Sequence, residues 1–256
     1  MDFITLTKDN IENEHICCAF SDKKSIEGYK AKKQWLEKQI KNGYVFIKLN
    51  ERAKVFIEYA PSEIAYLPVH APNYMVINCF WVSGKYKDNG YGKKLLNKCI
   101  EDSKKKGKDG IVILSSDKKR PFMSHKKFFL KHGFEKCDIA KPYFELLYLK
   151  LKDEAAIPQF EETTRNATCH NNGGFKVYYS NQCPYMNYYI DLQSRIAKEE
   201  GYIFEKVLID SREKAFKNPS PFTIYSLFYN GNFITQELTA EKKFRKIIEE
   251  ASKRNV

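Results

Sequence analysis

Gly90 and Gly92 stand two residues apart, after an apolar run at 75–82 and at the start of an amphipathic run at 92–105. The apolar run is rich in β-branched and aromatic residues and predicts a buried strand, whereas the amphipathic run predicts a helix. Backbone N–H groups at the start of a helix lack acceptors within the helix, and the helix dipole gives that end a partial positive charge. Glycine has no Cβ, so an anion can approach the backbone closely there. The pattern predicts a binding site for a phosphate or pyrophosphate group.

The neighbouring residues narrow the class of phosphate ligand. Lys87, Lys93 and Lys94 add positive charge around the two glycines. The dinucleotide pattern G-x-G-x-x-G requires a third glycine where Leu95 stands, and the sequence lacks the Gly-Lys-Ser/Thr of a P-loop. We therefore expect neither a dinucleotide nor a nucleoside triphosphate. From this spacing alone, an ordinary tight turn between a strand and a helix remains an alternative.

The positive charge of the chain is concentrated in its first part. Residues 1–150 hold 29 Lys and Arg against 18 Asp and Glu, which accounts for +11 of the total net charge of +12. Such a field attracts polyanions, either nucleic acid or a multiply phosphorylated cofactor. A solvated lysine-rich surface would carry the same charge. No motif in the sequence supports nucleic-acid binding, so we expect no nucleic-acid partner.

The cysteines and the hydrophobic pattern indicate the compartment. Seven cysteines are scattered along the chain without a C-x-x-C pair, so we expect neither structural disulfides nor a metal site. No stretch reaches the roughly 18 uninterrupted apolar residues of a membrane span. The N-terminus lacks the basic start and long apolar run of a secretory signal. We expect a cytoplasmic protein without a membrane partner.

A change of character at 152–174 divides the chain. This segment is polar, contains Pro158 and ends in Asn171-Asn172-Gly173-Gly174, which is typical of an interdomain linker. We expect one domain at 1–151, a linker at 152–174 and a second domain at 175–256. Strands are expected at 3–7, 44–49, 55–59, 75–82, 111–114, 143–150, 176–179, 204–209, 224–229 and 233–236, and helices at 23–42, 92–105, 124–132, 185–200 and 241–252.

The glycine segment resembles a known family motif. Lys87-Asp88-Asn89-Gly90-Tyr91-Gly92 is similar to the Arg/Gln-x-x-Gly-x-Gly/Ala motif of GNAT acetyltransferases, and the step from Val82 to Lys87 has that family's spacing. Gly133-Phe134 resembles the later Gly-Phe segment of the family. The resemblance covers residues 1–150. It implies the α/β GNAT acyl-CoA N-acyltransferase fold with a mixed central sheet.

Three further segments resemble bacterial GNAT proteins that carry a YoaP-like C-terminal domain. These segments are 56–61, 77–84 and 142–148. The resemblance implies a two-domain layout close to the one expected from composition.

The resemblance also implies a cofactor and a reaction. Acetyl-CoA would be the cosubstrate, with its pantetheine arm seated between two splayed parallel strands. A primary amine of a small molecule or peptide would attack the thioester directly. The residues implied in cofactor binding are Phe80, Trp81, Val82, Lys87, Asp88, Asn89, Gly90, Tyr91, Gly92 and Lys93.

The catalytic acid and base follow less directly from the motif. The family's usual acid is a Tyr four residues before the Gly-Phe pair, and Phe129 stands there. We take Ser116 as the candidate acid and Glu58 as the candidate base. Phe129 also motivates an alternative, a protein that binds acetyl-CoA as a sensor without turnover. Other candidate acids nearby in the sequence are Ser115, Tyr91 and His125.

The start of the second domain resembles another fold. Residues 177–186 are similar to the first strand, loop and helix of thioredoxin-like proteins, and 220–223 resemble the cis-proline segment of that fold. Cys183 would lie at a helix N-terminus, where the dipole lowers a thiol pKa. Met186 fills the place of the usual resolving cysteine. We expect a binding or substrate-shaping domain, with a monothiol redox role for Cys183 as the alternative.

Overall fold

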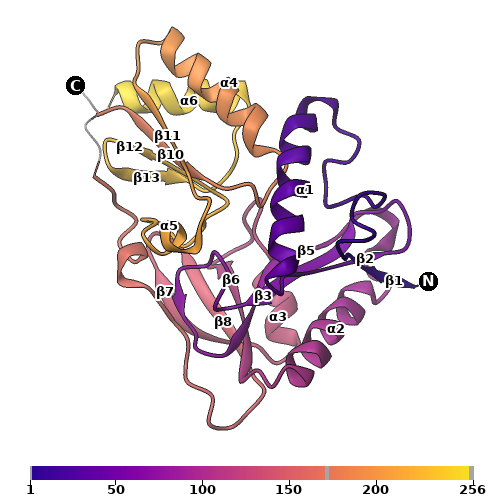
Figure 1. Cartoon of the computed structure of the whole chain (residues 1–256). Helices are drawn as coiled ribbons and strands as arrows, with labels where there is room; N and C mark the ends of the chain where they lie inside the picture. The colour runs from indigo at the N-terminus through magenta and orange to yellow at the C-terminus, as the bar shows by residue number, and fades with distance from the viewer. Residues whose placement is uncertain (1, 171–172, 254–256) are drawn as a thin grey trace.

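The computed structural model describes residues 2–170 and 173–253, so Asn171-Asn172 of the expected linker lies outside the described residues (Figure 1). The first part of the chain forms a seven-stranded sheet with the order β1-β2-β3-β5-β6-β8-β7. Only β5 and β6 run parallel, and every other neighbouring pair is antiparallel. The expected mixed sheet is confirmed. Its strands are β1 (Phe3–Thr5), β2 (Val45–Leu49), β3 (Val55–Pro61), β5 (Tyr74–Val82), β6 (Gly110–Ser116), β7 (Glu135–Ala140) and β8 (Phe144–Lys150).

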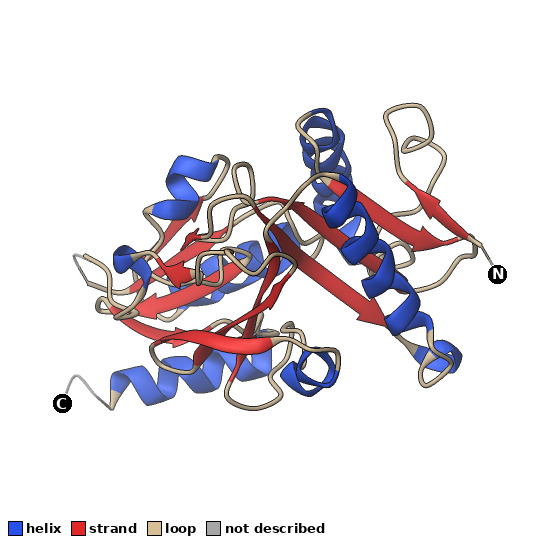
Figure 2. Cartoon of the chain, turned by 90° about the horizontal axis from the view of Figure 1, so that it is seen from below, coloured by secondary structure: helices blue, strands red, loops and turns tan. Residues whose placement is uncertain are grey.

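Helices cover both faces of this sheet, as Figure 2 shows. On one face, Trp35 and Leu36 of α1 (Ile26–Lys41) belong to the same buried cluster as Phe56. On the other face, α2 (Tyr91–Lys105) and α3 (Lys126–Lys131) pack in a second cluster that contains Ile57. Successive residues of a strand point to opposite faces, which places Phe56 and Ile57 in different clusters. Within the described ranges, no helix has both the length and the hydrophobicity needed to cross a membrane.

The edge strand β7 was not expected from the sequence. Its residues include Glu135, Lys136 and Asp138, so the run lacks an apolar alternation. Among the residues that the structure describes, β7 lies at the edge of the sheet and pairs with β8 alone. Charged side chains are common on edge strands because they hinder pairing with another chain. The same charges conceal such a strand from a search for hydrophobic patterns.

The segment after β8 packs against the first sheet over its described part. β9 (Gln159–Phe160) pairs with β4 (Val69–His70), and a 3₁₀ turn, η3, follows at Glu162–Thr164. Arg165 then forms a two-pronged ion pair with Asp138 of β7, with N–O distances of 2.8 and 3.0 Å. Paired strands and a bidentate ion pair fix this segment to the first sheet.

The second part of the chain has its own four-stranded sheet, ordered β11-β10-β12-β13. α4 (Met186–Glu199) and α6 (Glu241–Ser252) contribute to the same buried cluster, and a short helix α5 (Arg212–Phe216) follows β11. Asn230 and Gly231 both have positive φ between paired strands, as a type I′ hairpin turn requires. The strands are β10 (Phe175–Tyr179), β11 (Phe204–Leu208), β12 (Tyr225–Tyr229) and β13 (Asn232–Thr235).

The expected cis-proline is not present at residues 220–223. Among the described residues, the cis peptide bond is Lys141–Pro142, so Ser220–Pro221 is trans. The trans form of an X–Pro bond is favoured by about 0.5–1 kcal/mol unless a turn requires the other isomer. Here the Phe222 N–H donates to the Ser220 hydroxyl at 3.3 Å, which closes the turn in the trans form.

The two sheets are joined by a shared apolar cluster. Ile209, Ala215 and Phe222 of the second part belong to the same cluster as residues of the first sheet. The Tyr66 hydroxyl donates to the Asp210 carbonyl at 2.7 Å, between the two parts. This contact and the shared cluster hold the second part against the first sheet.

Candidate functional site

The two parallel strands separate at their carboxyl ends. Pairing between β5 and β6 runs from Tyr74–Gly110 to Ile77–Ile113 and stops there. β5 continues to Val82 along β3, and β6 continues to Ser116 along β8. A bulge at Asn78 shifts the register with β3 at this point, and a bulge bends the strand that carries it. A gap therefore opens between residues 78–82 and 114–116.

The start of α2 adjoins this gap. Its first backbone bond within the helix joins the Lys94 N–H to the Gly90 carbonyl, so the preceding amides have no acceptor inside the helix. Gly90 has a φ of 76°, a left-handed conformation that suits glycine. A Cβ on Gly92 would lie 3.1 Å from the Phe128 ring and 3.4 Å from the Phe80 ring. The glycines therefore allow the turn and the close packing of α2 on β5.

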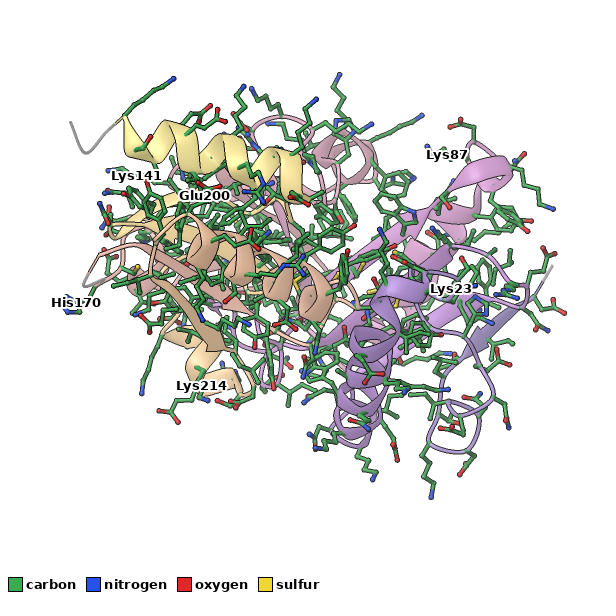
Figure 3. All side chains as sticks on the ribbon, turned by 90° about the horizontal axis from the view of Figure 1, so that it is seen from above. Lys23, Lys87, Lys141, His170, Glu200 and Lys214 are labelled. Carbon is green, nitrogen blue, oxygen red and sulfur yellow. The ribbon has the colours of Figure 1, made fainter. Side chains whose placement is uncertain are left out.

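The loop from Val82 to α2 is ordered by its own side chains. Asn89 donates to the carbonyls of Lys85 and Lys87, at 2.8 and 3.0 Å. Lys87 is exposed at the edge of the molecule, as Figure 3 shows. Lys93 is exposed as well, and neither lysine forms an ion pair within the described part of the chain. Two cations without acidic partners favour an anionic ligand beside the amides of α2.

The residues of β5 that we expect to bind the cofactor have side chains on both faces of the strand. Phe80 stacks on Phe128 at a ring distance of 5.0 Å, and Val82 packs in the same cluster. Trp81 lies on the opposite face and is 42 % exposed. The structure thus brings the segment 80–93 together at one end of the sheet. The assignment of these residues to cofactor binding stays a prediction.

Glu58 is buried in an ion pair that the sequence did not reveal. Its two carboxylate oxygens accept from the Lys32 ammonium at 2.5 Å and from the Tyr44 hydroxyl at 2.8 Å. Burial alone would lower the pKa of Lys32, but the adjacent carboxylate outweighs it and raises that pKa. Lys32 precedes Trp35 and Leu36 by three and four residues, which is the spacing of one helix face. That spacing was the available signal for a buried lysine.

The candidate acids are held in local hydrogen bonds. Ser116 Oγ donates to the Lys118 carbonyl at 2.8 Å, and Ser115 Oγ donates to the Ser124 carbonyl at 2.9 Å. Phe129, at the family's usual tyrosine position, is buried among the rings of Phe80, Phe128 and Phe134. The roles assigned to Glu58 and Ser116 stay predictions.

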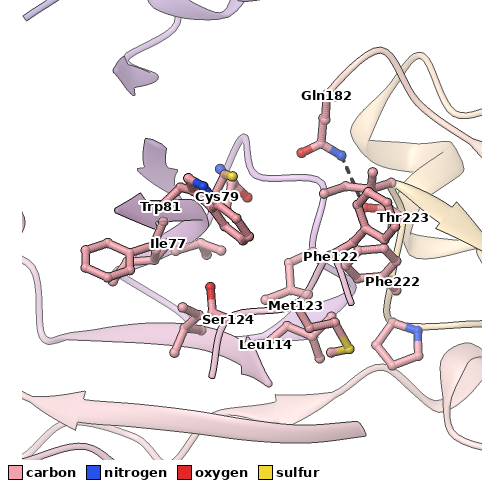
Figure 4. Close-up of a pocket in the computed structure, with 17 residues that line it drawn as sticks. Ile77, Cys79, Trp81, Leu114, Phe122, Met123, Ser124, Gln182, Phe222 and Thr223 are labelled. Carbon is pink, nitrogen blue, oxygen red and sulfur yellow. Dashed lines mark hydrogen bonds between the residues drawn. The ribbon is translucent and has the colours of Figure 1, made fainter. Parts of the chain in front are cut away.

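Two cavities lie where the strands separate. The smaller, about 70 Å³, is bounded by Ile77 and Leu114 of the strands and by Phe222 of the second part. Figure 4 shows Ile77, Cys79 and Trp81 on one side and Gln182, Phe222 and Thr223 on the other. The larger, which we call the interdomain cavity, has about 630 Å³ and is lined by both parts of the chain, including Trp81 and Tyr189.

Cys183 lines the interdomain cavity but lacks the properties of a reactive thiol. α4 begins three residues later, at Met186. Burial raises the pKa of Cys183 to about 12 and outweighs the backbone hydrogen bond that lowers it. This direction of the pKa shift is opposite to the one expected for a thiol at a helix N-terminus, because burial disfavours the charged thiolate.

Comparison with known proteins follows the same division of the chain. The family described as "Acetyltransferase (GNAT) family" matches residues 9–134, and the family described as "YoaP-like" matches residues 204–246. A Bacillus subtilis (strain 168) protein described as "Uncharacterized N-acetyltransferase YoaP" is 43 % identical over 248 residues. The match covers 97 % of this chain and 98 % of that protein.

Solved structures match a share of the chain. The PaiA N-acetyltransferase of Thermoplasma acidophilum, in complex with coenzyme A, is 17 % identical and covers 59 % of this chain and 99 % of its own, with a TM-score of 0.42. A GNAT family acetyltransferase of Staphylococcus aureus Mu50 is 20 % identical with the same coverage and TM-score. The matches over residues 9–134 and 204–246, and the 43 % identity along nearly the whole chain, show that this protein belongs to the GNAT N-acetyltransferase family and carries a YoaP-like region.

Proposed function

We propose that the chain transfers the acetyl group of acetyl-CoA to a primary amine of a small molecule or peptide. Acetyl-CoA is the cosubstrate of this family. The observation that carries the proposal is the end of β5–β6 pairing at Ile77–Ile113, beside the amides at the start of α2. The pantetheine arm would lie between the strands, along the backbone of Phe80 and Val82. The diphosphate would accept hydrogen bonds from the amides between Lys87 and Lys93.

The acceptor would reach the thioester from the interdomain cavity. A neutral amine attacks the thioester carbonyl, the C–S bond breaks, and the coenzyme A thiolate leaves. We propose Ser116 as the group that protonates the thiolate. Its hydroxyl would have to leave the Lys118 carbonyl and donate to the thiolate instead. We propose Glu58 as the base, which requires its ion pair with Lys32 to open.

Cofactor binding and turnover test the proposal separately. Calorimetry should detect binding of coenzyme A to the full chain, and the variant Gly90→Val/Gly92→Val should bind at least tenfold more weakly, a loss of about 1.4 kcal/mol. Release of free thiol should depend on an added amine. If the wild type and the double variant bind coenzyme A equally, the cofactor site is elsewhere. If binding is tight but no amine releases thiol, the protein is a sensor rather than an enzyme.

For the second part of the chain, we propose a thioredoxin-like, substrate-shaping domain at 175–256, separated by the 152–174 linker from an acetyltransferase domain at 1–151. The order β10-α4-β11 followed by β12-β13-α6, with both helices on one face, supports this fold. The protonated state of Cys183 favours a substrate-shaping role over redox chemistry.

A further inference from the structure

We infer that the C-terminal region forms one wall of the acceptor site, and that the acceptor is a small amine with an aromatic body and an anionic group. The inference rests on the proposed acetyl transfer. It adds the acceptor class and assigns specificity to residues outside the acetyltransferase fold. The interdomain cavity, with its rings, thiols and charges, carries the inference.

Aromatic side chains from both parts face this cavity. Phe56 and Trp81 come from the first sheet, whereas Tyr185 and Tyr189 come from the start of α4. Phe122 also lines it, is 44 % exposed and has a φ of 62°, an unfavourable conformation for phenylalanine. About 630 Å³ suits a drug-sized ligand, and rings on opposite walls favour a flat apolar body between them.

Four thiols complete the apolar lining: Cys17, Cys18, Cys79 and Cys183. Burial raises the pKa of each of them, so they stay protonated at neutral pH. A protonated cysteine packs as a small hydrophobic side chain. Within the described residues, no group of His, Cys, Asp and Glu could hold a metal ion. The thiols therefore extend the surface that an apolar ligand contacts.

The charges of the cavity leave one cation without an acidic partner. Lys32 is paired with Glu58, and the Asp22 carboxylate accepts from the Lys24 N–H and the Ser25 hydroxyl, each at 3.0 Å. Lys54 is half-buried and has no ion pair or side-chain hydrogen bond within residues 2–170 and 173–253. A cation beside an apolar cavity favours a ligand that carries a carboxylate or another anionic group.

The wall from the C-terminal region is fixed in place. A Cβ on Gly28 of α1 would lie 2.0 Å from the Pro184 carbonyl oxygen, so the loop before α4 rests directly on α1. Tyr188, the neighbour of Tyr189, lies with its ring 5.7 Å from the Lys24 ammonium of the first part. The two parts of the chain therefore pack together around the cavity. An acceptor must be small enough to enter between them.

Ligand binding tests the inference without requiring turnover. Phenylalanine and phenethylamine share a ring and an amine but differ in the carboxylate. Calorimetry on the full chain, saturated with coenzyme A, should show phenylalanine binding about tenfold more tightly. Lys54→Met should abolish that difference, and Lys30→Met, which removes an exposed cation of α1, should preserve it. Equal binding of the two ligands to the wild type would overturn the anionic part of the inference.

A second pair of variants tests the wall. Tyr189→Ala should weaken phenylalanine binding about tenfold, because it removes a ring that lines the cavity. Arg195→Ala changes an exposed residue of α4 that does not line the cavity, and this variant should bind phenylalanine as the wild type does. Equal effects of the two variants, or none, would overturn the role of the C-terminal region. Butylamine, which lacks a ring, should bind more weakly than phenethylamine.

Turnover separates this inference from the proposed function. Suppose that phenylalanine binds as expected while none of phenylalanine, phenethylamine, butylamine and a lysine-containing peptide is acetylated. In that case the cavity assignment holds and the proposed acetyl transfer fails. If a lysine-containing peptide is acetylated faster than phenylalanine and Tyr189→Ala leaves that rate unchanged, acetyl transfer holds and the acceptor inference fails.

Discussion

At the scale of single residues, the strongest electrostatic feature is the buried Lys32–Glu58 pair. Both side chains are about 1 % exposed, and Tyr44 supplies a further hydrogen bond to the carboxylate. A buried ion pair contributes little net stability compared with apolar residues of the same size, but loss of one partner leaves an uncompensated charge. The pair links α1 to β3. Replacing both residues together should therefore lower the free energy of unfolding less than replacing either one alone.

Glu58→Gln should lower the free energy of unfolding by about 3–5 kcal/mol, because Lys32 would remain buried without a counter-charge. Urea denaturation measures this, with Glu27→Gln, in an exposed pair with Lys30, as the control that changes little. The joint replacement Lys32→Met/Glu58→Leu should recover most of the loss. Acetyl transfer that persists in this joint variant would contradict the role of Glu58 as base.

His15 should make stability depend on pH below neutrality. Burial lowers its pKa from 6.5 and outweighs the hydrogen bond to the Ala53 carbonyl. The unfolded chain therefore binds a proton at His15 more readily than the folded chain does. The contribution of neutral His15 to the free energy of unfolding is fully present above pH 6.5. It is lost as the pH falls towards the lower pKa of the folded state. The stability difference between the wild type and His15→Gln should shrink from pH 7 to pH 5 in urea titrations. A difference that is constant or grows would contradict this sign.

At the scale of elements, α2 has left-handed glycines beside both of its ends. Gly90 precedes the helix with a φ of 76°, and Gly107 follows it with a φ of 64°. An added Cβ would meet nothing within 4 Å at either position. The two positions therefore share the same backbone strain but differ in which end of the helix they adjoin.

Gly90→Ala and Gly107→Ala should each cost roughly 1–2 kcal/mol of stability, because an L-residue is strained in the left-handed region. Only Gly90→Ala should also weaken coenzyme A binding, since the anion site is proposed for the N-terminal end of α2. Thermal unfolding and calorimetry on both variants measure the two effects. Equal loss of affinity in both would show that general destabilisation, not the local amides, causes it.

At the scale of the whole molecule, the two sheets share one apolar cluster and close a cavity between them. Contacts across the boundary include Tyr143 with Gln236 and Arg212 with the Ser62 carbonyl. Interfaces that bury apolar side chains hold neighbouring domains in one arrangement. Specificity can then depend on residues far along the chain from the cofactor motif, such as Tyr189.

Gly28→Ala should displace the loop before α4, because the new Cβ would meet the Pro184 carbonyl group, which belongs to the backbone. We expect faster hydrogen exchange at residues 182–189 and weaker acceptor binding, with coenzyme A affinity unchanged. Gln34→Ala, at an exposed position of the same helix, is the control. Unchanged exchange at 182–189 in Gly28→Ala would show that α1 does not hold this wall.

Local patterns in the amino-acid sequence were enough to predict the short-range features of the fold. Hydrophobic periodicity placed most of the strands and the main helices, and the spacing from Val82 to Gly92 identified the family. Asn230-Gly231 specified its turn. These features depend on residues that lie a few positions apart, so they can be predicted from the pattern of residue types along the sequence.

Contacts between residues far apart in the chain follow from the fold and could not be predicted from local patterns. Lys32 reaches Glu58 across 26 positions, and β7 is a strand because β8 pairs with it despite its charged pattern. The interdomain cavity combines Lys54 with Tyr189, and the pKa of Cys183 follows from its burial there. Sheet order and domain packing determine burial, and burial determines which charges and thiols can react.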